Sequence, residues 1–114
     1  MKRNMKQWVA ETIANPVKKG VPVLSFPAVQ LMDITVRDLI SSSDLQAKGM
    51  KMVADKVNSG ASVSLMDLSV EAECFGSTIR VTDDEVPTVI GAVVSDEDAA
   101  DALAIPEVGV CRTG

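Results

Sequence analysis

The sequence predicts an α/β fold that begins with a βαβ unit. Two short apolar runs, 21–26 and 63–68, have the length of strands and are apolar enough to be covered on both faces. The stretch between them has helical periodicity and two helix start signals. A strand, a helical crossover and a second strand of this kind are parallel and right-handed in nearly every known case.

Composition places further bounds on the fold and on the function. The 114 residues suffice for one domain, and an aromatic content of 3% leaves aliphatic side chains and methionine to form the core. The net charge of -5 argues against a nucleic-acid partner, and no apolar run approaches the length of a membrane helix. Without a signal peptide, the chain is expected to be cytoplasmic, with Cys74 and Cys111 as reduced thiols.

The first elements follow from apolar spacing and from proline and glycine. Apolar side chains at 5, 8, 9 and 13 predict an amphipathic helix that ends before Pro16. A Lys-Lys-Gly turn leads into the strand 21–26, in which Pro22 suits only a position near the strand start or an edge strand. Pro27 closes this strand, and a loop is expected over 28–34.

Two capping boxes predict the crossover helices. Thr35 and Asp38 are spaced to satisfy the first free amides of a short helix over 35–42. Ser43 and Gln46 do the same for a longer helix over 44–58, which Ser59-Gly60 would end. One face of this longer helix carries apolar or small residues at five positions: Leu45, Gly49, Met52, Val53 and Val57.

The second half of the chain predicts shorter elements. A helical turn over 69–75 is expected to end at Gly76, and a third strand to cover 77–81. The acidic segment 82–85 is interpreted as a turn, because its spacing fits no EF-hand loop. An extended segment over 89–94 and a helix from a capping box at 95–98 through about residue 103 complete the prediction.

Asp67 is the candidate site residue. It lies at the carboxyl end of the second strand, where open α/β sheets and barrels place their active sites. A partly desolvated carboxylate there suits proton transfer or the binding of a cationic substrate group. The alternative is that Asp67 caps the next turn through the amide of Ser69 or Val70. Glu71 and Glu73 are expected to be a solvated helix start.

The absence of histidine excludes some mechanisms within this chain. Ser-His, Cys-His and His-metal chemistry all need a residue type that the sequence lacks. The two cysteines form no CxxC pattern. No metal site is therefore expected among these residues.

Four short segments of the sequence together resemble one enzyme superfamily. The run Leu-Met-Asp-Leu-Ser-Val-Glu-Ala-Glu-Cys-Phe-Gly over 65–76 is the most specific, and Val-Pro-Val-Leu-Ser-Phe over 21–26, Thr-Val-Arg-Asp-Leu over 35–39 and Asp-Glu-Val-Pro-Thr over 84–88 accompany it. Together they resemble the N-terminal third of the uroporphyrinogen decarboxylase superfamily, and within it the corrinoid-linked methyltransferase branch (methylcobamide:coenzyme M methyltransferases).

The resemblance implies an incomplete (β/α)₈ TIM barrel, because that fold takes about 250 residues. Residues 1–20 would form a helix outside the barrel, and 21–114 the first two βα units with an excursion. The strands over 21–26 and 62–67 would be barrel strands one and two. Asp67 would match the aspartate with which the decarboxylases hold substrate pyrrole nitrogens. Partners would be further copies of this chain or the missing C-terminal part of the barrel.

The implied function is that of the N-terminal part of a methyltransferase. Such an enzyme moves a methyl group from a methyl-corrinoid protein to a thiol or similar acceptor, with zinc held by later His and Cys residues. This chain lacks those ligands and is expected to be inactive alone. Two alternatives are a non-catalytic accessory domain derived from the barrel and a decarboxylase-like enzyme. The decarboxylase is disfavoured because Phe26-Pro-Ala-Val-Gln30 lacks the arginine that grips substrate carboxylates.

Overall fold

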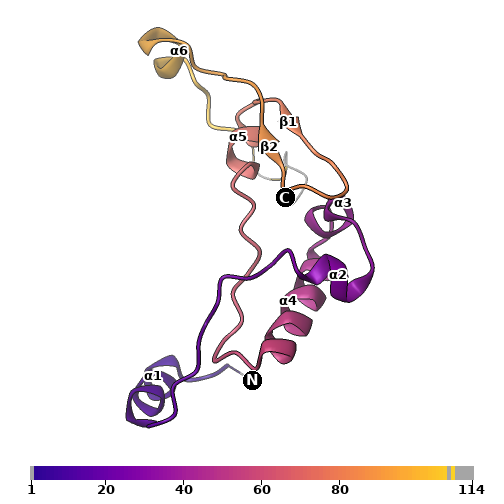
Figure 1. Ribbon diagram of the computed structural model, residues 1–114. Coiled ribbons are helices and arrows are strands. Elements are labelled where there is room, and N and C mark those ends of the chain that lie inside the picture. The colour runs from indigo at the N-terminus through magenta and orange to yellow at the C-terminus, as the bar shows by residue number, and fades with distance from the viewer. Residues whose placement is uncertain (1, 108, 110–114) are drawn as a thin grey trace.

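The computed structural model describes residues 2–107 and 109 (Figure 1). The molecule is elongated, with extents of 54 × 34 × 24 Å. Its elements in chain order are α1 (Met5–Ala14), α2 (Ala28–Met32), α3 (Val36–Ile40), α4 (Ser43–Val57), α5 (Val70–Cys74), β1 (Ile79–Arg80), β2 (Thr88–Val89) and α6 (Glu97–Asp101). Helices and a small sheet thus occur in one chain, and the fold is α/β in this general sense. Among the described residues, no helix combines the length and apolarity needed to cross a membrane.

The core lies where α2 and α3 pack against α4. Four buried residues form its cluster, and four partly buried side chains surround them: Ala28, Leu39, Met50 and Val53, then Phe26, Val29, Ile34 and Leu65. The predicted apolar face of α4 is confirmed at Gly49 and Val53, which are buried. The prediction is wrong at Met52, which is 41% exposed. Met50, which the prediction left out of this face, is buried instead.

The two predicted parallel strands run as extended backbone without forming a sheet. The amide of Gly60 donates to the carbonyl of Gly20 (2.9 Å), and no other backbone hydrogen bond joins 21–26 or its flanks to 61–68. Farther along, Leu24 and Val63 line the same crevice against α4. The two segments therefore run side by side in the same direction, as Figure 1 also shows.

Burial along the second segment alternates with a period of two. Residues 61, 63, 65 and 67 are half-buried, and residues 62, 64, 66 and 68 are exposed. Such alternation is typical of a strand covered on one face. The prediction that this run is covered on both faces is wrong, because the helices cover only one side of it. The sheet that does form pairs β1 with β2 antiparallel, through Ile79 with Val89 and Arg80 with Thr88.

Side chains at the helix ends explain most of the helix boundaries. The capping box of Thr35 and Asp38 is confirmed. Ser42, one residue before the predicted Ser43, caps α4 by accepting from the amide of Leu45. Asn58 ends α4 in the left-handed region with φ 49°, in place of the predicted Ser59-Gly60 stop.

Three further boundaries differ from the prediction or refine it. The expected loop over 28–34 contains α2, which follows Pro27 because its fixed φ suits a helix start. Asp96 rather than Ser95 caps α6. The predicted opening helix and the helical turn over 69–75 are confirmed as α1 and α5.

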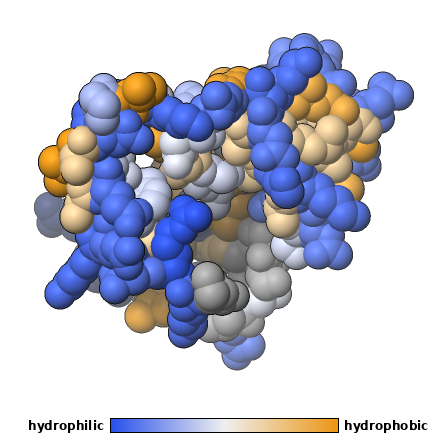
Figure 2. Space-filling model, turned by 90° about the horizontal axis from the view of Figure 1, so that it is seen from below, coloured by the Kyte–Doolittle hydropathy of each residue, from blue (hydrophilic) through white to orange (hydrophobic). Residues whose placement is uncertain are grey.

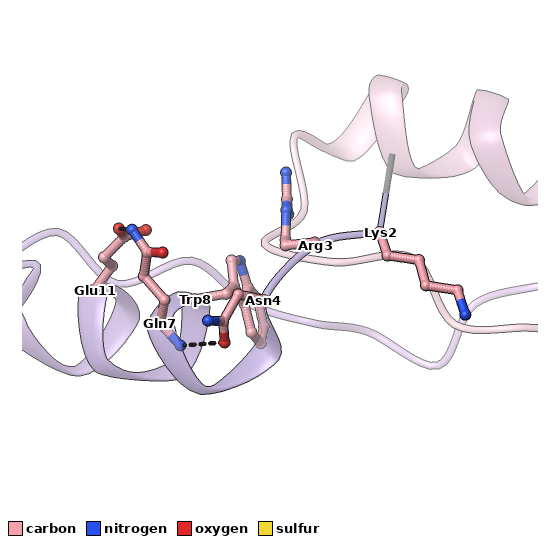
Figure 3. A pocket seen from close by; sticks show the side chains of 6 residues that line it. All are labelled: Lys2, Arg3, Asn4, Gln7, Trp8 and Glu11. Carbon is pink, nitrogen blue, oxygen red and sulfur yellow. Dashed lines mark hydrogen bonds between the residues drawn. The ribbon is translucent and has the colours of Figure 1, made fainter.

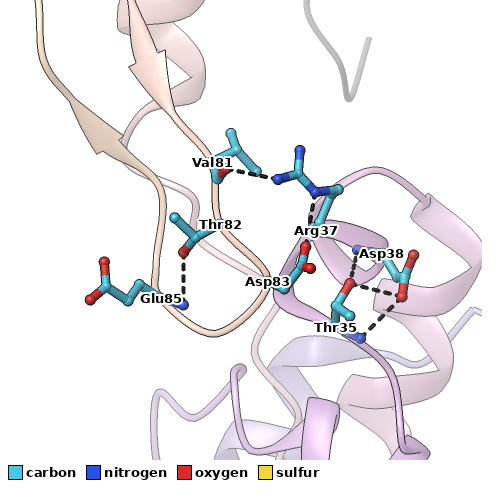
Figure 4. Close-up of polar contacts among 7 residues, drawn as sticks. All are labelled: Thr35, Arg37, Asp38, Val81, Thr82, Asp83 and Glu85. Carbon is cyan, nitrogen blue, oxygen red and sulfur yellow. Dashed lines mark hydrogen bonds and ion pairs between the residues drawn. The ribbon is translucent and has the colours of Figure 1, made fainter.

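The hairpin loop between β1 and β2 is held on α3 (Figure 4). Arg37 donates from Nε to Asp83 Oδ1 (3.0 Å) and from Nη2 to the carbonyl of Val81 (2.9 Å). The amide of Val36 donates to the carbonyl of Asp83 (2.8 Å). Within the loop, Thr82 Oγ1 accepts from the amide of Glu85, so the acidic segment serves as a turn, as predicted.

Acid is expected to weaken the start of α3. The Asp38 carboxylate accepts from the amide of Thr35 (3.0 Å) and from its hydroxyl (2.8 Å), and these bonds lower the pKa of Asp38. Because the folded-state pKa lies below the unfolded one, this stabilisation is present above the unfolded value of 3.8 and is lost as the pH falls through the folded value. Urea midpoints of the wild type and Asp38→Asn, compared at neutral pH and at about pH 3, should differ less in acid. An equal difference at both pH values would contradict this cause.

Much of the apolar surface is not enclosed. Figure 2 shows hydrophobic side chains reaching the surface in separate groups among hydrophilic ones. Ile13, Val23 and Leu68 are 73%, 70% and 79% exposed, whereas six apolar residues are buried in the part of the chain that the structure describes. The helices that pack together therefore cover a small part of the available apolar area.

Candidate functional site

Asp67 lies in a tight turn between the second extended segment and α5. Its Oδ1 accepts from the amide of Ser69 (3.0 Å) and from the Ser69 hydroxyl (2.7 Å). The backbone amide of Val70 donates to the carbonyl of Asp67 (3.3 Å). Ser69 is 2% exposed, so this turn is fixed by buried hydrogen bonds. The predicted capping role through the amide of Ser69 is confirmed.

The same carboxylate also borders a hollow of about 260 Å³. The hollow lies between α4 and the end of the second extended segment, and its lining residues are Gln46, Ser64, Leu65, Met66, Asp67, Val70 and Glu71. Two carboxylates and one amide thus face three apolar side chains, and no basic residue is present in the lining. Such a hollow suits a small molecule with an apolar part and a cationic or hydrogen-bond-donating group.

Glu71 lies at the hollow, whereas Glu73 is half-buried away from it. Glu71 is exposed, yet it lines the hollow beside Asp67, which a merely solvated helix start does not explain. Glu73 is absent from the lining, and its amide donates to the carbonyl of Ser69 (2.9 Å). The two glutamates therefore lie on different sides of α5, as their spacing predicts.

Gln46 lines the hollow, although its sequence position predicts a different role. The spacing from Ser43 predicts that Gln46 completes a capping box, but α4 begins one residue earlier than predicted. The Gln46 side chain accordingly donates to the carbonyl of Ile40 (3.4 Å) and lines the hollow. No sequence signal pairs Gln46 with Asp67, because their proximity depends on how α4 packs beside the second extended segment.

The described residues do not fit the zinc site that the resemblance implies. No group of three or more His, Cys, Asp or Glu side chains converges among them, and the sequence has no histidine. Cys74 is in a disulfide, so the expectation of a reduced thiol is wrong for this residue and it offers no thiolate ligand. Cys111 lies outside the described residues.

Other hollows of the described residues lie apart from Asp67. One of about 310 Å³ follows the first extended segment, between Phe26, Val36 and the hairpin residues Asp84 and Val86. It has no basic residue either, in keeping with the missing arginine of the decarboxylases.

A larger hollow of about 480 Å³ lies at the start of α1 (Figure 3). Its lining includes Lys2, Arg3 and Trp8. The side chain of Gln7 donates from Nε2 to Glu11 Oε1 (2.8 Å), and the backbone amide of Gln7 donates to Asn4 Oδ1 (3.2 Å). These contacts belong to the helix cap and to the surface of α1. Figure 3 shows Lys2 and Arg3 extending in different directions, so they do not converge on one ligand position.

Comparison of the chain with protein-family models, with curated proteins and with solved structures finds no match. The geometry around Asp67 therefore carries the functional argument together with the sequence resemblance.

Proposed function

We propose that this chain is the N-terminal part of a methyltransferase of the uroporphyrinogen decarboxylase superfamily. The complete enzyme would form a (β/α)₈ barrel and would move a methyl group from a methyl-corrinoid protein to a thiol or similar acceptor. In this proposal Asp67 lies at the acceptor-binding mouth of the barrel. The observation that carries the proposal is the position of Asp67 in a hollow at the carboxyl end of the second extended segment.

The arrangement of the two extended segments supports the proposal. They run in the same direction, and α4, which lies between them in the sequence, packs on one side of both. The hollows beside Phe26 and beside Asp67 lie near the carboxyl ends of the first and second segments, respectively. A barrel places its substrate-binding loops at this end of its strands.

The charges in the hollow favour a particular class of acceptor. Asp67 and Glu71 are the charged residues of the lining. A cationic thiol is attracted by this pair, whereas an anionic thiol such as a sulfonate is repelled. The volume of about 260 Å³ accommodates a small thiol but not a corrin ring. The proposed methyl donor would therefore bind at a surface that includes the rest of the barrel.

The acceptor site can be tested with small thiols. Cysteamine, a cationic thiol, should shift the backbone NMR signals of Val70 and Glu71 with a dissociation constant of the order of 1 mM. Mercaptoethanesulfonate, an anionic thiol, should leave them unchanged at the same concentration. Asp67→Asn should weaken cysteamine binding by roughly tenfold, since hydrogen bonds and pairs to charged groups contribute about 1.5–3 kcal/mol.

The matched control is Asp55→Asn on α4. Asp55 is an exposed carboxylate outside the hollow that pairs with Lys51, so cysteamine binding should persist in this variant. The proposal fails if both thiols shift the same signals, or if cysteamine binds Asp67→Asn as well as it binds the wild type.

The zinc of this family is not supplied by the described residues, so no step of the reaction is assigned to this chain alone. Its own contribution in the proposal is to bind and orient the acceptor. Zinc, a corrinoid protein and the remaining strands would come from the rest of the assembly.

The alternative is a non-catalytic accessory domain, which the exposed apolar residues favour. Val23 and Leu68 are 70% and 79% exposed and would be available for contact with a partner. This alternative predicts partner binding without any response to cysteamine. The decarboxylase-like reading rests on Asp67 alone, because neither hollow near the extended segments contains a basic residue.

A further inference from the structure

One side of α1 carries exposed apolar residues. Met5, Val9 and Ile13 are spaced four residues apart, so they lie one above the other on the same side of the helix. Their exposed fractions are 56%, 46% and 73%. We call these three residues the α1 stripe.

The other sides of α1 border hollows or carry polar groups. Gln7 and Glu11 lie opposite the stripe on the helix, are joined by a hydrogen bond (2.8 Å) and line the hollow of Figure 3. Trp8, the one half-buried residue of the helix, lines that hollow and a second one of about 220 Å³, which Val21 and Gly60 also line. No residue of the stripe lines either hollow. The stripe is therefore the side of α1 that remains open to a partner.

Basic residues border the stripe, and most acidic residues lie elsewhere. Residues 2–20 carry five basic side chains and one acidic one, Glu11. Lys6 is exposed and, seven positions before Ile13, lies along one edge of the stripe. Lys18 donates from Nζ to the carbonyls of Thr12 and Ile13 (2.9 and 2.7 Å), so its ammonium lies at the end of the stripe. Residues 67–107 carry eleven acidic side chains, and Figure 1 shows α6 at the opposite end of the molecule from α1.

From these observations we propose that α1 binds the surface of an anionic membrane. A helix with apolar side chains on one side and basic residues beside them lies among the lipid headgroups, where apolar burial and attraction to anionic lipids add. The molecule is 54 Å long, and salt screens charges over about 8 Å at physiological ionic strength. The acidic end therefore does not cancel the attraction at α1. This membrane contact involves none of the residues around Asp67 and is independent of the proposed acceptor-binding role.

Co-sedimentation of the full chain with lipid vesicles tests the proposal. The chain should bind vesicles of phosphatidylcholine mixed with phosphatidylglycerol, and it should not bind vesicles of phosphatidylcholine alone. Raising the salt concentration should weaken the binding. Trp8 is the sole tryptophan of the chain, so energy transfer from it to a dansyl-labelled lipid shows whether α1 itself lies at the bilayer. This transfer should accompany binding.

Two pairs of variants separate the apolar contribution from the charged one. Ile13→Ser should weaken binding by about tenfold, because the buried apolar area sets the strength of interfacial binding. Ile105→Ser makes the same change at a 90% exposed side chain outside α1 and should leave binding unchanged. Lys6→Gln should weaken binding by about fivefold, the effect of one basic residue near an anionic surface, whereas Lys48→Gln on α4 should have little effect. All four side chains are exposed, so the fold should persist, and circular dichroism checks it.

Three outcomes would overturn the proposal. One is the absence of binding to the anionic vesicles. Another is binding without energy transfer from Trp8, which would mean that a different surface contacts the bilayer. The third is self-association of the chain without lipid that Ile13→Ser abolishes, which would assign the stripe to a second copy of the chain.

Discussion

Leu39→Ala is expected to remove most of the chain's free energy of unfolding. Leu39 on α3 is fully buried in the cluster that joins α2, α3 and α4. Truncating a buried leucine to alanine costs about 2–5 kcal/mol, since the lost contacts leave a cavity. A folded domain is typically stabilised by only about 5–15 kcal/mol, and a core of six buried apolar residues among residues 2–107 and 109 places this chain towards the low end.

Thermal and urea unfolding followed by circular dichroism would measure this loss. Leu31→Ala on α2 makes the same chemical change at a side chain that is 38% exposed, and it should cost a fraction of the Leu39→Ala value. Equal costs for the two variants would show that the cluster around Leu39 does not hold the helices together.

Gly49→Ala is expected to destabilise the chain despite the better helix propensity of alanine. A Cβ added at Gly49 would lie 2.7 Å from the Cβ of Ala28 and 3.3 Å from the sulfur of Met32. Alanine in place of a helical glycine gains about 1 kcal/mol. Because Ala28 Cβ is fixed to the α2 backbone, the helices must separate, at a cost of about 1–3 kcal/mol. The net change in the free energy of unfolding should therefore be a loss.

The double variant Ala28→Gly with Gly49→Ala isolates this contact. Removing the Ala28 Cβ makes room for the new methyl group, so the second change should cost less in the Ala28→Gly background than in the wild type. Urea unfolding of the four proteins gives the interaction energy. Additive effects would mean that α2 and α4 are farther apart than the structure places them.

Helices were the part of the fold that could be predicted from sequence. Their signals are local: Thr35 and Asp38 satisfy amides only three residues apart, and the spacing of apolar residues shows α1 and α4. The errors are also local. Two adjacent serines precede α4, and the sequence cannot tell which of Ser42 and Ser43 caps it. The short α2 lies in a segment that the sequence predicts to be a loop, because five residues are too few to show periodicity.

The strands could not be predicted in the same way, because a strand exists only through its neighbours. Residues 21–26 and 61–68 have the right composition and the right direction, but their backbones do not pair with each other as a ladder. The pair that does form, Ile79 with Val89, lies in segments predicted to be extended, and only two residues of each participate.

The candidate site was predicted in part. The sequence identifies Asp67 as a candidate because it lies at the end of an apolar run. Its hydrogen bonds to Ser69 follow from local turn chemistry. Gln46 and Glu71 join it only through packing of distant segments. Sequence reasoning therefore identifies the carboxylate but not the composition of the hollow beside it.

The compact arrangement of the core cluster has a consequence for synthesis of the chain. All four buried members of the cluster lie between residues 28 and 53. Contacts between residues so close in sequence close small loops and form quickly. The cluster can thus assemble on the ribosome once α4 has emerged, and the acidic C-terminal half is then added to a chain that already holds its three packed helices.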